Sequence, residues 1–199
     1  MGQNNLNLAS LIGSRICHDL ISPIGAINNG LELLSMHDGP PSPELELIAD
    51  SVASANARIK FFRIAYGIPS EDHLVGAADA HSILADLTRG GRIQMTWEAT
   101  KDLPRALTQC AFLAIQCIES ALPYGGNIVV YQKDNNLEIR GAADQLNIDA
   151  NLWNSLLDRD ARAGLLPAQV QFALLPELVQ NRNRTLEVNA TEREITISL

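Results

Sequence analysis

A histidine and an aspartate stand side by side in the sequence RICHDLISPI, residues 15–24. A neutral imidazole nitrogen is nucleophilic near neutral pH, and histidine can carry a covalently bound group. A carboxylate beside it can accept a hydrogen bond from the second ring nitrogen and stabilise the charge that develops. We therefore interpret His18 as a nucleophile and Asp19 as the group that orients it. The ordinary alternative is a solvated surface histidine.

The residues around His18 favour a site over a solvated side chain. On a helix, Leu11 and five small or polar neighbours lie within about 60 degrees of His18: Ser14, Arg15, Ser22, Gly25 and Asn29. This face is mostly small or polar, which leaves room for a second surface to approach. Pro23 removes a helical hydrogen bond and is expected to bend the helix just past the histidine. We predict that the five neighbours form a docking rim.

Two helices are expected to position this face. Apolar residues recur with helical spacing over residues 8–36, on the side opposite His18. Ser42, Pro43 and Glu44 form a helix start signal, and the second helix is expected to end at Gly67. Its apolar residues follow steps of three and four, typical of a bundle seam: Leu45, Ile48, Val52, Ala55, Ile59, Phe62 and Tyr66.

A lone helical hairpin cannot cover both of its apolar faces. We therefore expect a homodimer in which two hairpins form a four-helix bundle across a two-fold axis. The alternative is a hairpin that packs on the rest of its own chain. We assign residues 1–68 to this hairpin.

The pattern changes after residue 70, and residues 77–199 are predicted to form an α/β domain. Five short strands and several helices predict one sheet with helices on one face. The strands are expected within 92–99, 127–133, 137–142, 185–190 and 194–199, and the helices within 77–89, 104–122 and 149–181. The hairpin over 127–142 is expected to turn at Asp134 and Asn135.

Composition excludes several classes of protein. The 199 residues include 15 basic and 23 acidic side chains, a net charge of -8, which disfavours nucleic acid as a partner. Three cysteines without CxxC spacing fit reduced thiols, and no metal site is predicted. There is no signal-peptide pattern and no apolar run of 18 residues, so we expect a cytoplasmic protein with no membrane partner.

The motif HDLISPI resembles the H-box of histidine-kinase dimerisation domains, which combines His, an acid, a small hydroxyl residue, Pro and an aliphatic residue. The second half is similar to a kinase ATP-binding (Bergerat) domain that has lost its nucleotide motifs. Residues 108–124 contain no asparagine for magnesium, and IRGAADQLNID stands where an Asp-x-Gly-x-Gly motif is expected. The lid region GLLPAQVQFALL has one glycine. This combination resembles the ChpT family of histidine phosphotransferases.

The resemblance implies a place in a multistep phosphorelay of two-component signal transduction. His18 would accept phosphate from the receiver domain of a hybrid histidine kinase and pass it to response regulators. The chain would need no cofactor of its own, because magnesium would belong to the receiver, and it would have no autokinase activity and no ATP binding. Two alternatives remain: an ATP-dependent histidine kinase, which the missing motifs oppose, and a non-catalytic dimeric adaptor that binds a kinase or regulator.

Overall fold

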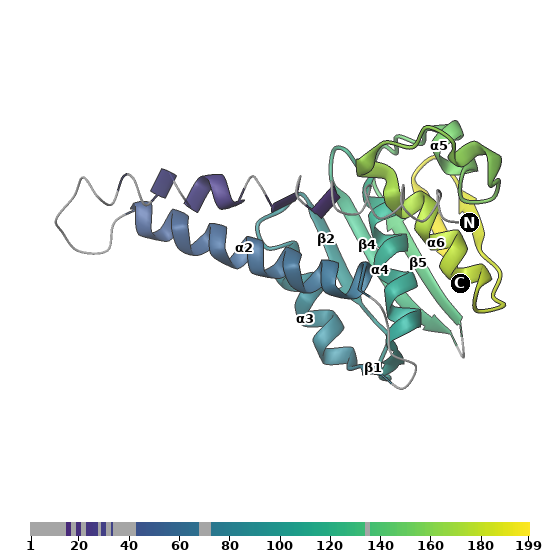
Figure 1. The fold of residues 1–199 in the computed structure, drawn as a ribbon, viewed down its shortest axis with the longest axis horizontal. Helices are drawn as coiled ribbons and strands as arrows, with labels where there is room; N and C mark the ends of the chain where they lie inside the picture. The colour runs from purple at the N-terminus through teal and green to yellow at the C-terminus, as the bar shows by residue number, and fades with distance from the viewer. Residues whose placement is uncertain are drawn as a thin grey trace.

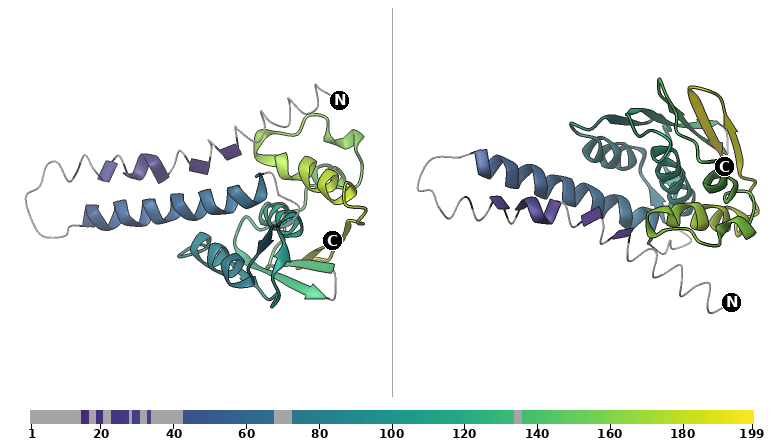
Figure 2. Two further views of the ribbon diagram at one scale, coloured as in Figure 1. Left: turned by 60° about the horizontal axis from the view of Figure 1, so that its bottom comes forward. Right: turned by 90° about the horizontal axis from the view of Figure 1, so that it is seen from above.

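A long helical hairpin projects from a mixed helix-and-sheet body in the computed structural model (Figure 1). The structure describes residues 15, 16, 19, 20, 23–27, 29, 30, 33, 43–67, 73–133 and 136–199. All described residues between 15 and 33 are helical, and we call this segment the first helix. It lies along α2 (Pro43–Ala65) in both further views of the chain (Figure 2).

The start of α2 confirms the signal read from the sequence. The helix begins at Pro43, and Glu44 and Glu46 lie in its first turn, where acids complement the helix dipole. The first helix approaches α2 closely at Gly30, which is buried. A Cβ at Gly30 would overlap the Ile48 side chain and lie 3.3 Å from the Glu44 carbonyl oxygen. The absence of a side chain therefore permits this contact.

The predicted bundle seam divides into two sets of residues. Ala55 and Phe62 are buried within the chain. Leu45, Val52 and Ile59, each seven residues apart, remain 43%, 40% and 49% exposed. We call these three residues the outer stripe of α2. One part of the seam thus packs inside the hairpin, and the outer stripe faces away from the chain's own core.

The body contains a five-stranded sheet with the order β2-β4-β5-β7-β6. Its strands are β2 (Ile93–Trp97), β4 (Gly126–Lys133), β5 (Asn136–Ala142), β6 (Glu187–Ala190) and β7 (Glu194–Ser198). β2 runs parallel to β4, and the other pairs are antiparallel. All five strands confirm the sequence prediction. The turn predicted at Asp134 and Asn135 lies outside the described residues.

A second, two-stranded sheet was not predicted. It pairs β1 (Leu74–Val75) with β3 (Leu103–Pro104) in antiparallel fashion. Strands of two residues carry no period that a sequence pattern could reveal. Pro104 accordingly ends a strand, and the helix expected within 104–122 begins one residue later, at Arg105.

The helices lie on one face of the sheet, as predicted. They are α3 (Ala77–Leu87), α4 (Arg105–Glu119), α5 (Ala150–Asn154) and α6 (Val170–Gln180), with short 3-10 helices η1 (Asp160–Arg162) and η2 (Pro167–Gln169). Helix α4 packs on the sheet and is buried from Leu107 to Ile118. Cys110 and Cys117 on α4 are free, buried thiols, and burial raises the pKa of Cys110 to about 11.

Gly141 on β5 lies where α4 meets the sheet, and we expect Gly141→Ala to destabilise the fold. A Cβ there would overlap the Ile118 Cγ2 methyl and lie 3.2 Å from the Ile195 Cγ2 methyl. Both neighbours are fully buried, so the free energy of unfolding should fall by about 1–3 kcal/mol. Chemical denaturation measures this loss. Gly25→Ala is the control, because nothing lies within 4 Å of its added Cβ; equal stability of the two variants would contradict the packing argument.

The end of α2 belongs to the core of the body. Phe61 stacks on Phe112 of α4, with ring centroids 4.7 Å apart and an interplanar angle of 19°. The Gln109 side-chain amide donates to the carbonyl oxygens of Ala65 (3.1 Å) and Gly67 (3.0 Å). Arg105 donates to the carbonyl oxygen of Arg63. These side chains satisfy carbonyls that a helix end leaves without partners. The end of α2 and helix α4 therefore belong to one core.

None of the helices within the described ranges is long and apolar enough to cross a membrane.

Candidate functional site

The first helix carries an ion pair that brackets position 18 in the sequence. Arg15 Nε lies 2.8 Å from Asp19 Oδ2, and the two residues are four apart on the helix. The side chains are only 17% and 9% exposed. Few water molecules therefore compete for this contact, which strengthens the attraction between the charges. Ile16, in the same turn, packs against the hydrophobic core and helps to seat the helix.

Arg15 also reaches the body of the protein. Its Nη1 donates a 3.1 Å hydrogen bond to the carbonyl oxygen of Ala168 in η2. The two residues are 153 positions apart in the chain. This bond joins the turn that precedes His18 in the sequence to the segment that leads into α6.

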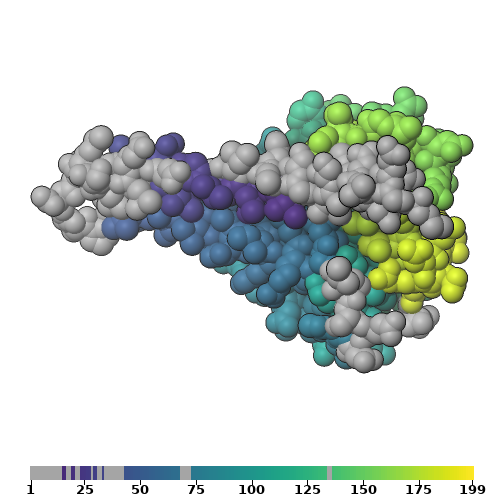
Figure 3. All heavy atoms as spheres, viewed as in Figure 1, coloured from purple at the N-terminus to yellow at the C-terminus, as the bar shows by residue number. Residues whose placement is uncertain are grey.

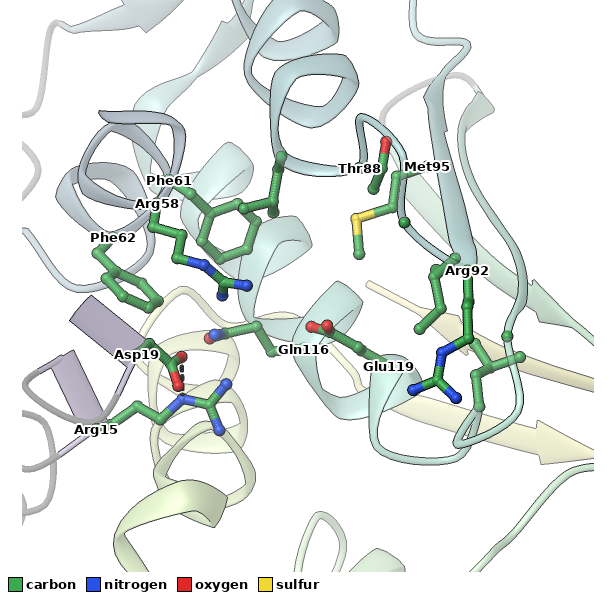
Figure 4. A pocket seen from close by; sticks show the side chains of 15 residues that line it. Arg15, Asp19, Arg58, Phe61, Phe62, Thr88, Arg92, Met95, Gln116 and Glu119 are labelled. Carbon is green, nitrogen blue, oxygen red and sulfur yellow. Dashed lines mark ion pairs between the residues drawn. The ribbon is translucent and has the colours of Figure 1, made fainter. Parts of the chain in front are cut away.

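A cavity of about 280 Å³ opens beside the ion pair (Figure 4). Its walls come from the first helix, the last turns of α2, the end of α4 and the loop between α3 and β2. The charged and amide side chains that line it are Arg15, Asp19, Arg58, Arg92, Gln116 and Glu119. Apolar walls are supplied by residues such as Phe61, Phe62 and Met95. The cavity therefore lies where the hairpin meets the body.

The electrostatics of the cavity reflect its burial. Burial raises the pKa of the Glu119 carboxyl, and the positive charges of Arg15 and Arg58 offset part of that rise. Burial likewise raises the pKa of the Tyr66 hydroxyl, which donates a 2.6 Å hydrogen bond to Gln116 Oε1. Glu119 thus has cationic neighbours from both helices of the hairpin.

A wider groove runs along the hairpin next to this cavity. It measures about 920 Å³ and passes Asp19, Pro23 and α2 toward the end of α3. Small residues form much of its floor, among them Ala26, Ala53, Ser54 and Ala57. Such a surface lets another backbone or a compact domain come close to the first helix.

The structure brings together part of the predicted site. Gly25 and Asn29 lie on the first helix; Asn29 is exposed, and an added Cβ at Gly25 would meet open space. Arg15 forms the ion pair with Asp19 and donates a hydrogen bond to the Ala168 carbonyl, and its docking role stays a prediction. His18, Ser14 and Ser22 lie outside the described residues. Among the described residues, no group of three or more His, Cys, Asp or Glu side chains could hold a metal ion.

Sequence reasoning missed several residues of the cavity. Glu119 is the single charged residue in the apolar run 106–123, and that isolation is a signal that could have marked it. Arg58, Arg92 and Gln116 carry no local signal, because only the tertiary fold brings their elements to one place.

Known proteins resemble this chain in sequence and in fold. Residues 77–194 match the family of the histidine phosphotransferase C-terminal domain. The protein phosphotransferase ChpT of Brucella abortus (strain 2308) is 35% identical over 137 residues, which cover 68% of this chain and 65% of that protein. The match therefore spans slightly less than two thirds of that relative. A solved structure of a bacterial phosphotransferase superposes with a TM-score of 0.79 at 29% identity, over 97% of this chain and 95% of the other.

The matched domain and the superposed fold define a class, the histidine phosphotransferases. Within that class, the chain belongs to the ChpT family.

Proposed function

We propose that the protein is a phosphorelay intermediate whose phosphoacceptor is His18. A nitrogen of the neutral imidazole attacks the phosphorus of a receiver aspartyl phosphate. A P–N bond forms, the P–O bond to the acyl oxygen breaks, and the receiver aspartate leaves as a carboxylate. The imidazole gains positive charge, which the Asp19 carboxylate stabilises. The reverse attack by a second receiver aspartate passes the phosphoryl group on. Catalysis of this kind depends on in-line positioning and charge stabilisation.

The observation that carries this proposal is that His18 and Asp19 are adjacent in the sequence of a chain of the ChpT family, and that Asp19 lies on the first helix. The groove beside Asp19 supports docking of a compact partner, and we assign that partner to the receiver domain of a hybrid histidine kinase and to response regulators. Magnesium would be supplied by the receiver. We place the relay in the cytoplasm.

The test is transfer of ³²P from a phosphorylated receiver protein to the full chain, with magnesium and without ATP. A label that is acid-labile and alkali-stable identifies phosphohistidine and supports the proposal. Binding of the receiver without any transfer would contradict it and favour the alternative, a non-catalytic dimeric adaptor.

The hairpin supports a homodimer held by a four-helix bundle. The outer stripe of α2 leaves Leu45, Val52 and Ile59 exposed at heptad spacing. Ile24 and Leu33 on the first helix are exposed as well, at 50% and 42%. Figure 3 shows that the hairpin extends well away from the body, so a second hairpin has access to it. A self-complementary apolar stripe of this kind fits pairing across a two-fold axis.

We expect no ATP binding by the second domain, which we interpret as a degenerate Bergerat domain. Trp153 packs edge-on against Phe172, with ring centroids 5.4 Å apart, and both side chains are buried. Leu156 and Leu175 are also buried in the same core. Large side chains thus occupy the layer around α5 and α6. A fluorescent ATP analogue should show no saturable binding, whereas saturable binding with magnesium would favour the histidine-kinase alternative.

The second domain is expected to contribute to partner recognition. Leu166 is 61% exposed and lies two residues before Ala168, the residue that Arg15 contacts. An exposed apolar side chain so close to the first helix suits the edge of a docked receiver. Leu166→Asp should weaken receiver binding about tenfold or more, measured by calorimetry, since large apolar contacts commonly dominate an interface. Leu74→Asp, at a 56% exposed site on β1, is the control; equal affinities of both variants would contradict this role.

A further inference from the structure

We propose that Arg15 is a positioning residue for the transfer reaction, which fixes the Asp19 carboxylate and couples it to the second domain through Ala168. The sequence alone suggested a docking contact for Arg15; in the structure its guanidinium also forms an ion pair with Asp19 and donates a hydrogen bond to the Ala168 carbonyl. This inference rests on the proposed function, because it concerns the carboxylate that follows His18 in the sequence.

The ion pair restricts the motion of Asp19. Arg15 Nε and Asp19 Oδ2 lie 2.8 Å apart, and both atoms are buried from solvent. An aspartate on an exposed helix samples several rotamers, and an ion pair of this kind selects one of them. A carboxylate that is already oriented requires no reorganisation when positive charge develops on a neighbouring imidazole. Arg15 would therefore act on the reaction through Asp19 and without touching the phosphoryl group.

The second bond anchors Arg15 itself. Its acceptor, the Ala168 carbonyl oxygen, belongs to a turn that is held in place by its own hydrogen bonds. The Leu166 backbone N–H donates to Gln169 Oε1 at 2.9 Å, and the Gln169 backbone N–H donates to the Leu166 carbonyl at 2.8 Å. Pro167 fixes one dihedral of the same turn. The acceptor is thus preorganised, and the position of Asp19 depends on the placement of the second domain.

The chemistry of this bridge requires an arginine. Nε lies 2.8 Å from Asp19 Oδ2 as an ion pair without hydrogen-bond geometry, and Nη1 of the same rigid, planar guanidinium donates a hydrogen bond to the Ala168 carbonyl. A lysine carries one ammonium group on a flexible stem, so it can pair with Asp19 but cannot hold both groups in a fixed geometry. Arg15→Lys therefore separates the charge of Arg15 from its bridging function.

The experiment is a double-mutant cycle in the full chain with Arg15→Ala, Asp19→Asn and the double variant. Single-turnover transfer from a phosphorylated receiver gives the maximal rate and the receiver concentration at half-saturation. We expect Arg15→Ala to lower the maximal rate roughly tenfold and to leave the half-saturating concentration unchanged, as for a contact pair whose effects are coupled. In the Asp19→Asn background, Arg15→Ala should slow transfer little further. Arg15→Lys should restore part of the rate.

Arg140→Ala is the matched control, because Arg140 makes a 2.7 Å ion pair with Glu138 on β5 and takes no part in the site. Thermal unfolding of each variant verifies the fold. Arg15→Ala transfer at the wild-type rate would overturn the inference, as would rate losses that multiply independently with those of Asp19→Asn. If the wild-type chain accepts no phosphoryl group, the proposed function falls; if it does and only the cycle fails, the role of Arg15 alone falls.

Discussion

His18→Ala should abolish phosphorylation of the protein and leave its fold and oligomeric state unchanged. The imidazole is the proposed site of the P–N bond, so its removal takes away the proposed acceptor. The helical wheel places His18 on the side opposite the apolar residues of the first helix, so its removal costs little packing. Transfer of ³²P from a phosphorylated receiver measures the loss, and circular dichroism with sedimentation measures the fold and the assembly.

His81→Ala is the matched control for this experiment. His81 lies exposed on α3, away from the cavity, and its variant should accept phosphate at the wild-type rate. An acid-labile, alkali-stable label that persists on His18→Ala would show that another histidine carries the phosphoryl group.

Ile59→Glu should convert a dimer into monomers or unfolded chains. Ile59 lies in the outer stripe of α2, and in the proposed bundle it would be removed from water against the second copy. A buried carboxylate without a partner costs several kcal/mol, which is comparable with the stability of a typical small domain. Sedimentation velocity at micromolar concentration is the measurement, and the wild-type chain should sediment as a dimer.

Ala53→Glu distinguishes an interface effect from a general effect of charge on α2. Ala53 is also exposed, but it lies about 120 degrees around the helix from Ile59, outside the outer stripe. This variant should remain dimeric. A wild-type chain that sediments as a monomer would contradict the bundle, and dissociation by both substitutions would contradict the assigned interface.

The sequence predicted the elements well where a local pattern defines them. Helix α2 begins at Pro43, and the proline and the acids of its first turn act within that one turn. Apolar and polar residues alternate along the strands of the main sheet, and this alternation can be seen in the sequence of each strand by itself. By contrast, β1 and β3 are two residues long and exist only because they pair with each other.

The candidate site was predicted only in part, for a physical reason. The His-Asp pair is local and could be recognised from ten residues. The ion pair of Arg15 with Asp19 has the i, i+4 spacing that a helix favours, but the side chain's second bond crosses 153 positions to a backbone carbonyl. Every residue has a backbone carbonyl, so nothing in the sequence marks Ala168 as the acceptor. The partner of the Arg15 guanidinium is therefore known only from the folded chain.

The hydrogen bonds from Gln109 and Arg105 to the carbonyls at the end of α2 also constrain how the length of this helix can change. Because that end is fixed to the body, an insertion of one residue between Ile59 and these carbonyls would turn the outer stripe by about 100 degrees relative to the sheet. A second copy bound to that stripe would then face a different side of the body. An insertion or deletion of about seven residues would return the outer stripe to nearly its original angle around the helix axis. The angular phase of α2, as much as its apolar content, thus sets the geometry of any assembly through this helix.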